Sequence, residues 1–321
     1  MAARPMRHRA WLALTLTALA ASPALAAAEA DEARVALTGM AEAMRRLDYQ
    51  GSFTYEHSGR TDTLRIFHAG APLERERLVS LNGPRSEVIR SGSDVTSIQA
   101  DGSATVFSGS GRGLVPLVPD ASRPLLDAQY EIRVSGSDRV AGYAADVIDV
   151  TPRDRYRYGY RLWLERNTRL LLRSVVTDPE RRPLEQIMFV SLDIGTAPSE
   201  VDLVPQRSEL RTTSAAPANE LVVRGKPYWR VDPVPPGFAF VSARRPKQGP
   251  EGVEHLVYSD GLASVSIYVE PRGDAQPGFD TLAGRGIVNV FSRVEDTWRI
   301  TVLGEVPLAT VQAIGQGLQR N

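Results

Sequence analysis

The chain has no cysteine among its 321 residues. Disulfides, zinc–thiolate sites, iron–sulfur clusters, cysteine nucleophiles and a lipid-modified N-terminal cysteine are therefore excluded. The chain also has no excess of basic charge, because its 38 lysines and arginines are equal in number to its 38 aspartates and glutamates. A dedicated nucleic-acid binder usually carries a clear basic excess, so this class is disfavoured. What remains is an ordinary globular composition, with 42% hydrophobic and 24% charged residues.

Few residues are arranged for catalysis or metal binding. Three histidines follow the N-terminal segment, His57, His68 and His255, and none belongs to an HExxH pattern or a similar ligand spacing. His57 and His68 lie in neighbouring predicted strands, so a metal site from this pair is conceivable but not favoured. No GxSxG motif is present, and the glycine-rich segment 109–113 lacks the GK[ST] ending of a phosphate-binding loop. We expect no catalytic residues, no cofactor and no metal, so the protein is predicted not to be an enzyme.

The N-terminal segment has the features of a cleaved signal peptide. A basic stretch at residues 4–9 precedes an apolar stretch, Ala10 to Ala21, which is short for a membrane span. Small residues then follow, and we place cleavage after Ala26, with Ala28 as the alternative position. The competing interpretation is an N-terminal membrane anchor. No later stretch approaches the ~18 uninterrupted apolar residues of a transmembrane helix, so we expect a soluble protein in the periplasm.

The hydrophobic period changes from helical to strand-like near residue 48. Apolar residues recur at helical spacing from Asp31 to Leu47, and from Tyr49 onward they alternate with polar residues. About ten short strands follow at the spacing typical of an antiparallel sheet. They are expected at residues 49–57, 61–68, 85–90, 95–99, 104–107, 130–134, 144–151, 155–165, 170–177 and 183–194. This pattern favours one large antiparallel sheet that is curled or partly closed.

A second, smaller domain is expected after a linker. Serine, threonine, alanine and proline dominate residues 208–219, and this composition is typical of a linker. We divide the chain into a signal peptide (1–26), a large N-terminal domain (27–205), a linker (206–225) and a small C-terminal α/β domain (226–321). Five strands, with a hairpin turn at Asp260-Gly261, and a closing helix from Pro307 to Leu318 are predicted for the small domain.

One strand candidate, residues 153–164, separates two kinds of side chain. The period of two places Arg153, Arg155, Arg157, Arg161 and Trp163 on one face, and tyrosines and leucines on the other. The simpler interpretation is a half-buried strand with a solvated arginine face. The alternative is a cavity wall beside a basic rim, which would suit an amphiphile with an acidic head group.

Several stretches, in order along the whole chain, resemble the MucB/RseB family of periplasmic sigma-E regulators. In the first domain they are Tyr49-Gln50-Gly51-Ser52-Phe53-Thr54-Tyr55, Leu64-Arg65-Ile66-Phe67-His68, Asn82-Gly83-Pro84-Arg85-Ser86-Glu87-Val88 and Tyr158 to Leu164. In the second they are Pro235-Pro236-Gly237-Phe238, Ser242-Ala243-Arg244-Arg245-Pro246, Leu256 to Leu262 and Val302-Leu303-Gly304-Glu305-Val306-Pro307. Each stretch alone is weak evidence, and the ordered set is specific.

The resemblance implies an α+β, mostly β fold. The large domain would be an incompletely closed β-barrel like the LolA/LolB lipoprotein carriers, with an apolar cavity, and the small domain a separate α/β unit. Members of the family bind the periplasmic segment of a transmembrane anti-sigma factor and shield it from site-1 proteolysis. A lipid or lipopolysaccharide signal releases them, and no cofactor is implied.

We predict two sets of functional residues, one for a lipid cavity and one for partner binding. The alternation of apolar residues predicts that the lipid cavity is lined by Phe53, Tyr55, Leu64, Ile66, Tyr158 and Leu162. The partner-binding candidates are Arg244, Arg245, Tyr258 and Tyr268, and strand addition by a partner requires that the hairpin around Asp260 lies at a sheet edge. The simpler interpretation is that the hairpin is internal sheet and the two arginines belong to a solvated face. The alternative function is a soluble periplasmic carrier of lipid or lipoprotein, which would need only the large domain. The sequence leaves open the exact lipid and the oligomeric state, including a homo-oligomer.

Overall fold

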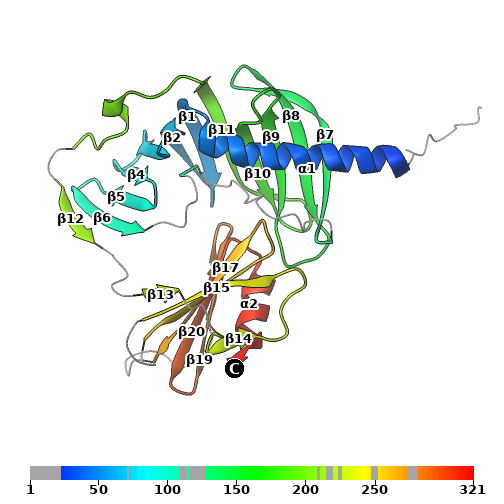
Figure 1. The fold of residues 1–321 in the computed structure, drawn as a ribbon, viewed down its shortest axis with the longest axis vertical. Helices are drawn as coiled ribbons and strands as arrows, with labels where there is room; N and C mark the ends of the chain where they lie inside the picture. Colours follow the sequence, from blue (N-terminus) through cyan, green and yellow to red (C-terminus); the bar gives the residue numbers. More distant parts are fainter. Residues whose placement is uncertain are drawn as a thin grey trace, which may run out of the picture.

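A computed structural model describes residues 23–70, 72–108, 114–115, 128–207, 210–214, 220–222, 226–246, 252–272 and 281–321. Two sheets dominate this part of the chain, one of twelve strands and one of seven, and a two-stranded sheet accompanies the smaller one. Each large sheet carries one α-helix, and the two sheets form separate halves of the molecule (Figure 1). The basic and apolar stretches of the predicted signal peptide lie outside the described residues, up to residue 22.

The large sheet comprises β1 (Tyr49–His57), β2 (Arg60–Ala69), β3 (Arg75–Ser80), β4 (Glu87–Ser91), β5 (Asp94–Ile98), β6 (Ser103–Ser108), β7 (Tyr130–Val140), β8 (Tyr143–Pro152), β9 (Gly159–Glu165), β10 (Leu171–Thr177), β11 (Pro183–Ile194) and β12 (Arg211–Ser214). Their order is β12-β6-β5-β4-β3-β2-β1-β11-β10-β9-β8-β7. All neighbours are antiparallel except β12 and β6. The end strands β12 and β7 do not pair with each other, so the sheet is open. The predicted large antiparallel sheet, incompletely closed, is confirmed.

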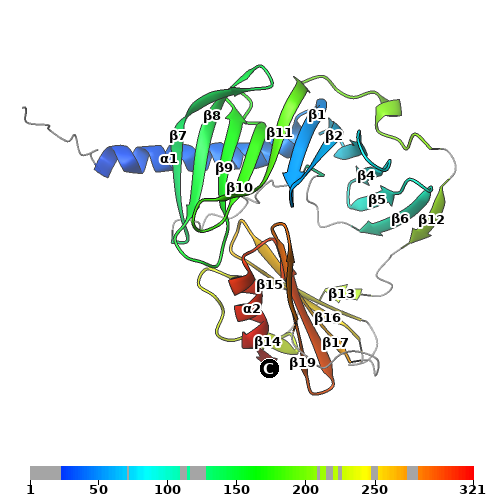
Figure 2. The ribbon, with the colours of Figure 1, turned by 180° about the vertical axis from the view of Figure 1, so that it is seen from behind.

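Helix α1 (Pro23–Arg46) crosses the face of this sheet, as the two opposite views in Figures 1 and 2 show. Its buried residues recur at helical spacing and join the apolar core of the large sheet. They are Ala33, Ala36, Leu37, Met40, Ala43 and Met44. The predicted apolar stripe of this helix is confirmed, although the helix begins at Pro23 rather than Asp31. No helix in the described part of the chain is long and apolar enough to cross a membrane.

The small sheet comprises β13 (Glu220–Val222), β15 (Ala239–Pro246), β16 (Glu254–Ser259), β17 (Ser264–Pro271), β18 (Thr281–Arg285), β19 (Val288–Glu295) and β20 (Trp298–Gly304). Their order is β13-β15-β16-β17-β20-β19-β18. Helix α2 (Leu308–Gly317) packs on it through Val311 and Ile314, which join the second apolar core. Strands β14 (Trp229–Val231) and β21 (Leu318–Arg320) pair beside it. A single-turn 3-10 helix, η1 (Glu200–Asp202), follows β11.

Two elements differ from the sequence-based expectation for physical reasons. Strand β3 is absent from the sequence-based prediction, because its sequence Arg-Glu-Arg-Leu-Val-Ser is too charged to look like a buried strand. In the structure Glu76 and Arg77 are nevertheless buried, since each is paired with an opposite charge. The predicted irregular linker, 206–225, contains β12 and β13. The first joins the large sheet and the second joins the small one.

Candidate functional site

The six predicted cavity residues belong to, or pack against, one apolar cluster of the large domain. Phe53, Ile66 and Leu162 are fully buried, and Tyr158 is 6% exposed. Tyr55 and Leu64 are partly buried and pack against the same cluster. The predicted sidedness of these strands therefore agrees with the structure, while the proposed lipid cavity stays a prediction.

Two tyrosines of this set connect the interior to the small domain. The hydroxyl of Tyr158 accepts a hydrogen bond from the side-chain amide of Asn289 at 2.9 Å, and burial raises the pKa of Tyr158 to about 12. Tyr55 donates to a carboxylate oxygen of Glu185 at 2.6 Å. The other oxygen of Glu185 accepts from the backbone nitrogen of Ile287, at 3.0 Å. One edge of the interior thus lies against the small domain.

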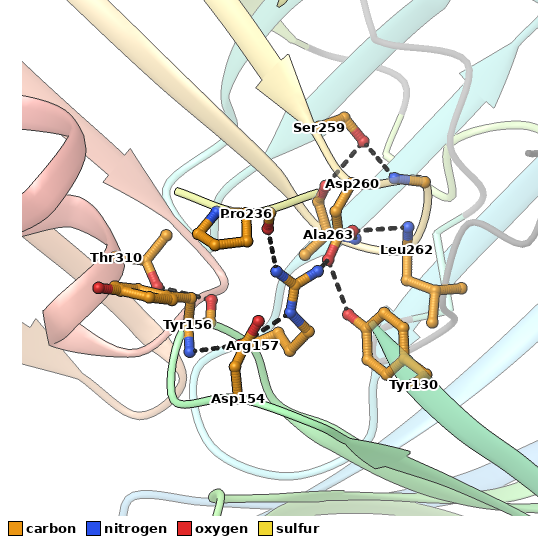
Figure 3. Close-up of polar contacts among 11 residues, drawn as sticks. Tyr130, Asp154, Tyr156, Arg157, Pro236, Ser259, Asp260, Leu262, Ala263 and Thr310 are labelled. Carbon is orange, nitrogen blue, oxygen red and sulfur yellow. Dashed lines mark hydrogen bonds and ion pairs between the residues drawn. The ribbon is translucent and has the colours of Figure 1, made fainter. Parts of the chain in front are cut away.

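A buried ion pair also joins the two domains (Figure 3). Arg157 and the carboxylate of Asp260 are fully buried, and the Nη1–Oδ2 distance is 2.6 Å. Tyr130, from β7, donates to the same Oδ2 at 2.9 Å. The other oxygen, Oδ1, accepts from the backbone nitrogens of Leu262 and Ala263. The Asp260-Gly261 turn is therefore a docking element between domains as well as a hairpin turn.

Arg157 satisfies its other donors within the same junction. Its Nε donates to Asp154 at 3.0 Å, and its Nη2 donates to the carbonyl oxygen of Pro236. Burial acts to lower the pKa of Arg157, but the hydrogen bond to Asp154 and the electrostatic interactions with Tyr130 and Asp260 outweigh burial and raise this pKa. Thr310, in α2, adds a hydrogen bond to the carbonyl of Tyr156 at 2.6 Å. A charge buried this fully is stable only when it is paired and hydrogen-bonded, and these contacts meet both conditions for Arg157.

The predicted arginine face is not continuous in the structure. Strand β9 begins only at Gly159, because residues 153–158 form a turn in which Asp154 accepts from the backbone nitrogen of Tyr156. The period of two therefore does not extend to Arg157, which points into the junction. Arg161 is half-exposed and paired with Asp149 at 2.6 Å. Of the five residues expected on this face, Trp163 is buried, and Arg153 and Arg155 are exposed in the turn. The solvated arginine face and the alternative of a basic rim are therefore both wrong for Arg157, and Trp163 does not share an exposed face with Arg161.

The predicted partner-binding residues lie in different environments. Tyr258 is 4% exposed and its hydroxyl accepts from the backbone nitrogen of Val231, so it is a core residue. Arg245 lies 3.8 Å above the ring of Tyr228 and donates to the carbonyl of Lys226. The condition of a sheet edge is not met, because β16 pairs with β15 and β17 pairs with β20, so the hairpin is internal sheet, as the simpler interpretation predicts.

The remaining two candidates are accessible. Arg244 is exposed, and Tyr268 is half-buried and stacks on His255, with the ring centroids 4.4 Å apart. Their role in partner binding stays a prediction. The junction is not predicted from the sequence, because Arg157 and Asp260 are 103 positions apart and no local pattern indicates that they pair.

Comparison with known proteins gives matches over both domains. The model of the MucB/RseB N-terminal domain matches residues 32–208, and that of the MucB/RseB C-terminal domain matches residues 223–319. The chain is 36% identical over 327 residues to the Sigma factor AlgU regulatory protein MucB of Pseudomonas aeruginosa, with 96% of each chain covered. It is 32% identical over 326 residues to the Sigma-E factor regulatory protein RseB of Salmonella typhimurium, covering 96% of this chain and 97% of the relative.

A solved structure is similar over nearly its full length. The crystal structure of MucB in complex with MucA(peri) matches with a TM-score of 0.68 and 33% sequence identity. The match covers 90% of this chain and 99% of that chain. A complex structure of Pseudomonas aeruginosa MucA/MucB matches with a TM-score of 0.67 and 32% identity.

Proposed function

This chain belongs to the MucB/RseB family, and from that premise we propose that it is a periplasmic negative regulator of a sigma-E-type envelope-stress response. It binds the periplasmic segment of a transmembrane anti-sigma factor and shields that segment from site-1 proteolysis. The protein acts by binding rather than by catalysis.

One observation carries this proposal. The likeness to MucB bound to MucA(peri) extends over both domains of the present chain. A carrier of lipid or lipoprotein would need only the large domain. Here the small domain is instead docked on the large one through a buried ion pair, as expected of a protein that presents a two-domain surface to its partner.

A pull-down from an envelope extract separates the regulator from the carrier. We expect a transmembrane anti-sigma factor to be captured in stoichiometric amount by the full chain. Capture of lipoproteins, without an anti-sigma factor, would instead support the carrier function and overturn the proposal.

The release signal in this proposal is a lipid or lipopolysaccharide that enters the apolar interior of the large sheet. The supporting observation is the common cluster formed by the six interior residues named above. A charge at Leu64, which is only partly buried, should weaken release by the lipid. Val190 is 52% exposed on β11 and offers a matched control.

The test measures how much lipopolysaccharide is needed to dissociate the complex. Leu64→Arg should raise this amount, whereas Val190→Arg should leave it unchanged. Equal behaviour of the two variants would remove the interior of the sheet from the release mechanism, while leaving partner binding intact.

A further inference from the structure

A ladder of buried polar side chains crosses four neighbouring strands at one end of the large sheet. Tyr49 on β1 pairs in register with His68 on β2, His68 pairs with Glu76 on β3, and Glu76 pairs with Arg90 on β4. All four are at most 2% exposed. Side chains directly opposite on adjacent strands share one face of a sheet and contact one another. Glu74, just before β3, completes the group and is 21% exposed.

Two atoms in this ladder are buried without a hydrogen-bond partner: the hydroxyl oxygen of Tyr49 and Nε2 of His68. His68 Nε2 lies 3.6 Å from an oxygen of Glu74 and 3.8 Å from an oxygen of Glu76, too far for a hydrogen bond. Its other nitrogen, Nδ1, lies 2.7 Å from the carbonyl of Leu47. A carbonyl only accepts, so Nδ1 carries a proton and donates it to Leu47, while Nε2 faces the two carboxylates.

These separations are slightly longer than those between the ligands of one metal ion. Zinc binds histidine nitrogen and carboxylate oxygen at about 2.0–2.2 Å, which places neighbouring ligand atoms of a tetrahedral site roughly 3.3–3.6 Å apart. The three candidate ligand atoms of His68, Glu74 and Glu76 all lie within 4.8 Å of one another. Small side-chain shifts would bring them around a single ion.

The surroundings also resemble the outer shell of a metal site. Ligating histidines generally donate a hydrogen bond from their second ring nitrogen to a carbonyl or carboxylate, as Nδ1 of His68 does to the carbonyl of Leu47. The far oxygen of Glu76 accepts from Arg90 Nε at 2.7 Å and from the backbone nitrogen of Leu114 at 2.9 Å. These bonds fix the carboxylate and leave its other oxygen facing His68.

The charge of the group favours a cation. Arg90 pairs with both Glu74 and Glu76, so one guanidinium faces two carboxylates and one negative charge is left over. Arg90 contacts the Glu74 oxygen that faces His68, and a carboxylate oxygen has a second lone pair for a metal. The partial exposure of Glu74 gives the ion a route in from solvent. We propose that His68, Glu74 and Glu76 form a zinc site, with water as the fourth ligand, which joins the end of α1 to strands β2 and β3.

The experiment titrates zinc chloride into the full chain after treatment with a chelator, and follows heat of binding and thermal unfolding. We expect one zinc ion per chain and a higher melting temperature with zinc. Cobalt(II), used as a spectroscopic substitute, should give the visible absorption of a tetrahedral site. Glu74→Gln and Glu76→Gln should each weaken binding by at least roughly tenfold.

Two variants serve as matched controls. Glu87 is a buried glutamate paired with Arg77, and His57 is paired with Asp62 near the opposite end of the β1–β2 hairpin. Glu87→Gln and His57→Gln should both retain zinc affinity. Loss of affinity in either control to the same extent as in Glu74→Gln would overturn the assignment.

Absence of zinc binding by the unmodified chain would also overturn it. In that case added zinc would change neither the heat signal nor the melting temperature of the chain.

Discussion

At the scale of single residues, burial decides what a charged side chain contributes. Arg157 and Asp260 are fully buried and paired across the domain junction, whereas Arg75 and Glu200 form a pair at the surface with Glu200 largely exposed. Removing one partner of a buried pair leaves an uncompensated charge, while an exposed partner is replaced by water. The two pairs therefore differ in their expected effect on stability.

Asp260→Asn should lower the free energy of unfolding by about 3 kcal/mol, because Arg157 then keeps its charge in a buried site with only Asp154 opposite. The measurement is urea unfolding followed by tryptophan fluorescence. Glu200→Ala, as the control, should leave the unfolding midpoint nearly unchanged. If Asp260→Asn behaves like the control, the junction is not a stabilising contact.

The environment of Asp149 predicts how the free energy of unfolding depends on pH. Burial acts to raise its pKa, but hydrogen bonds and charge from Arg161, with Arg133, outweigh burial and hold the pKa below its ordinary value. The ordinary aspartate pKa, about 3.9, applies to the unfolded chain. The stabilising contribution is therefore complete above about pH 4 and is lost as pH falls through the lower folded pKa.

Asp149→Asn should remove this contribution. Unfolding free energies of variant and parent, measured from pH 6 to pH 2, should converge as the pH falls below about 4. A constant difference at every pH would mean that the ion pair with Arg161 does not shift the pKa of Asp149.

At the scale of elements, the hydrophobic period predicts what depends on local pattern. It correctly predicts the buried stripe of α1 and the sidedness of β1 and β2, where Phe53 and Ile66 lie inside. It fails where a local hydrogen bond or a distant charge decides the outcome. The turn at Asp154 interrupts the alternating pattern of the strand before β9 begins. Strand β3 contains charged residues that are buried because they form ion pairs, and the sequence pattern does not indicate these pairs.

A substitution at Gly315 tests how closely α2 packs on the small sheet. A glycine inside a helix normally costs stability relative to alanine, by roughly 0.5–1 kcal/mol. Here a methyl group at Gly315 would lie 2.2 Å from the ring of Phe291 in β19. Gly315→Ala should therefore lower the melting temperature, despite the gain in helix propensity.

The control for this prediction lies one residue along the same helix. Gln316 is exposed, so Gln316→Ala should keep or slightly raise the melting temperature. A rise for Gly315→Ala as well would show that α2 does not approach β19 as closely as the structure places it.

At the scale of the whole molecule, the two domains are joined twice: along the chain and across the buried junction. The composition of residues 208–219 predicts a linker that proteases cleave first. The junction contacts of Arg157, Tyr158 and Glu185 do not depend on that linker. The two fragments should therefore stay together after cleavage.

Limited proteolysis followed by gel filtration checks this prediction. Mass spectrometry should place the first cut between residues 208 and 219, and both fragments should co-elute at the size of the intact chain. First cleavage elsewhere would contradict the predicted linker. Separate elution of the fragments would contradict a stable junction.

The layout of two domains could be predicted from the sequence, because linker composition and strand spacing are local features. Their docking could not, because Arg157 and Asp260 look like an exposed strand residue and a turn residue until the tertiary structure brings them together. For the same reason Tyr258, expected at the partner surface, proves to be a core residue.

The central claim is that the full chain protects an anti-sigma factor from proteolysis. The most direct measurement is the rate at which a site-1 protease cleaves the periplasmic segment of that factor, with and without this protein. We expect an equimolar amount of the protein to slow cleavage strongly, and added lipopolysaccharide to restore the rate. An unchanged cleavage rate in the presence of excess folded protein would contradict this protective function.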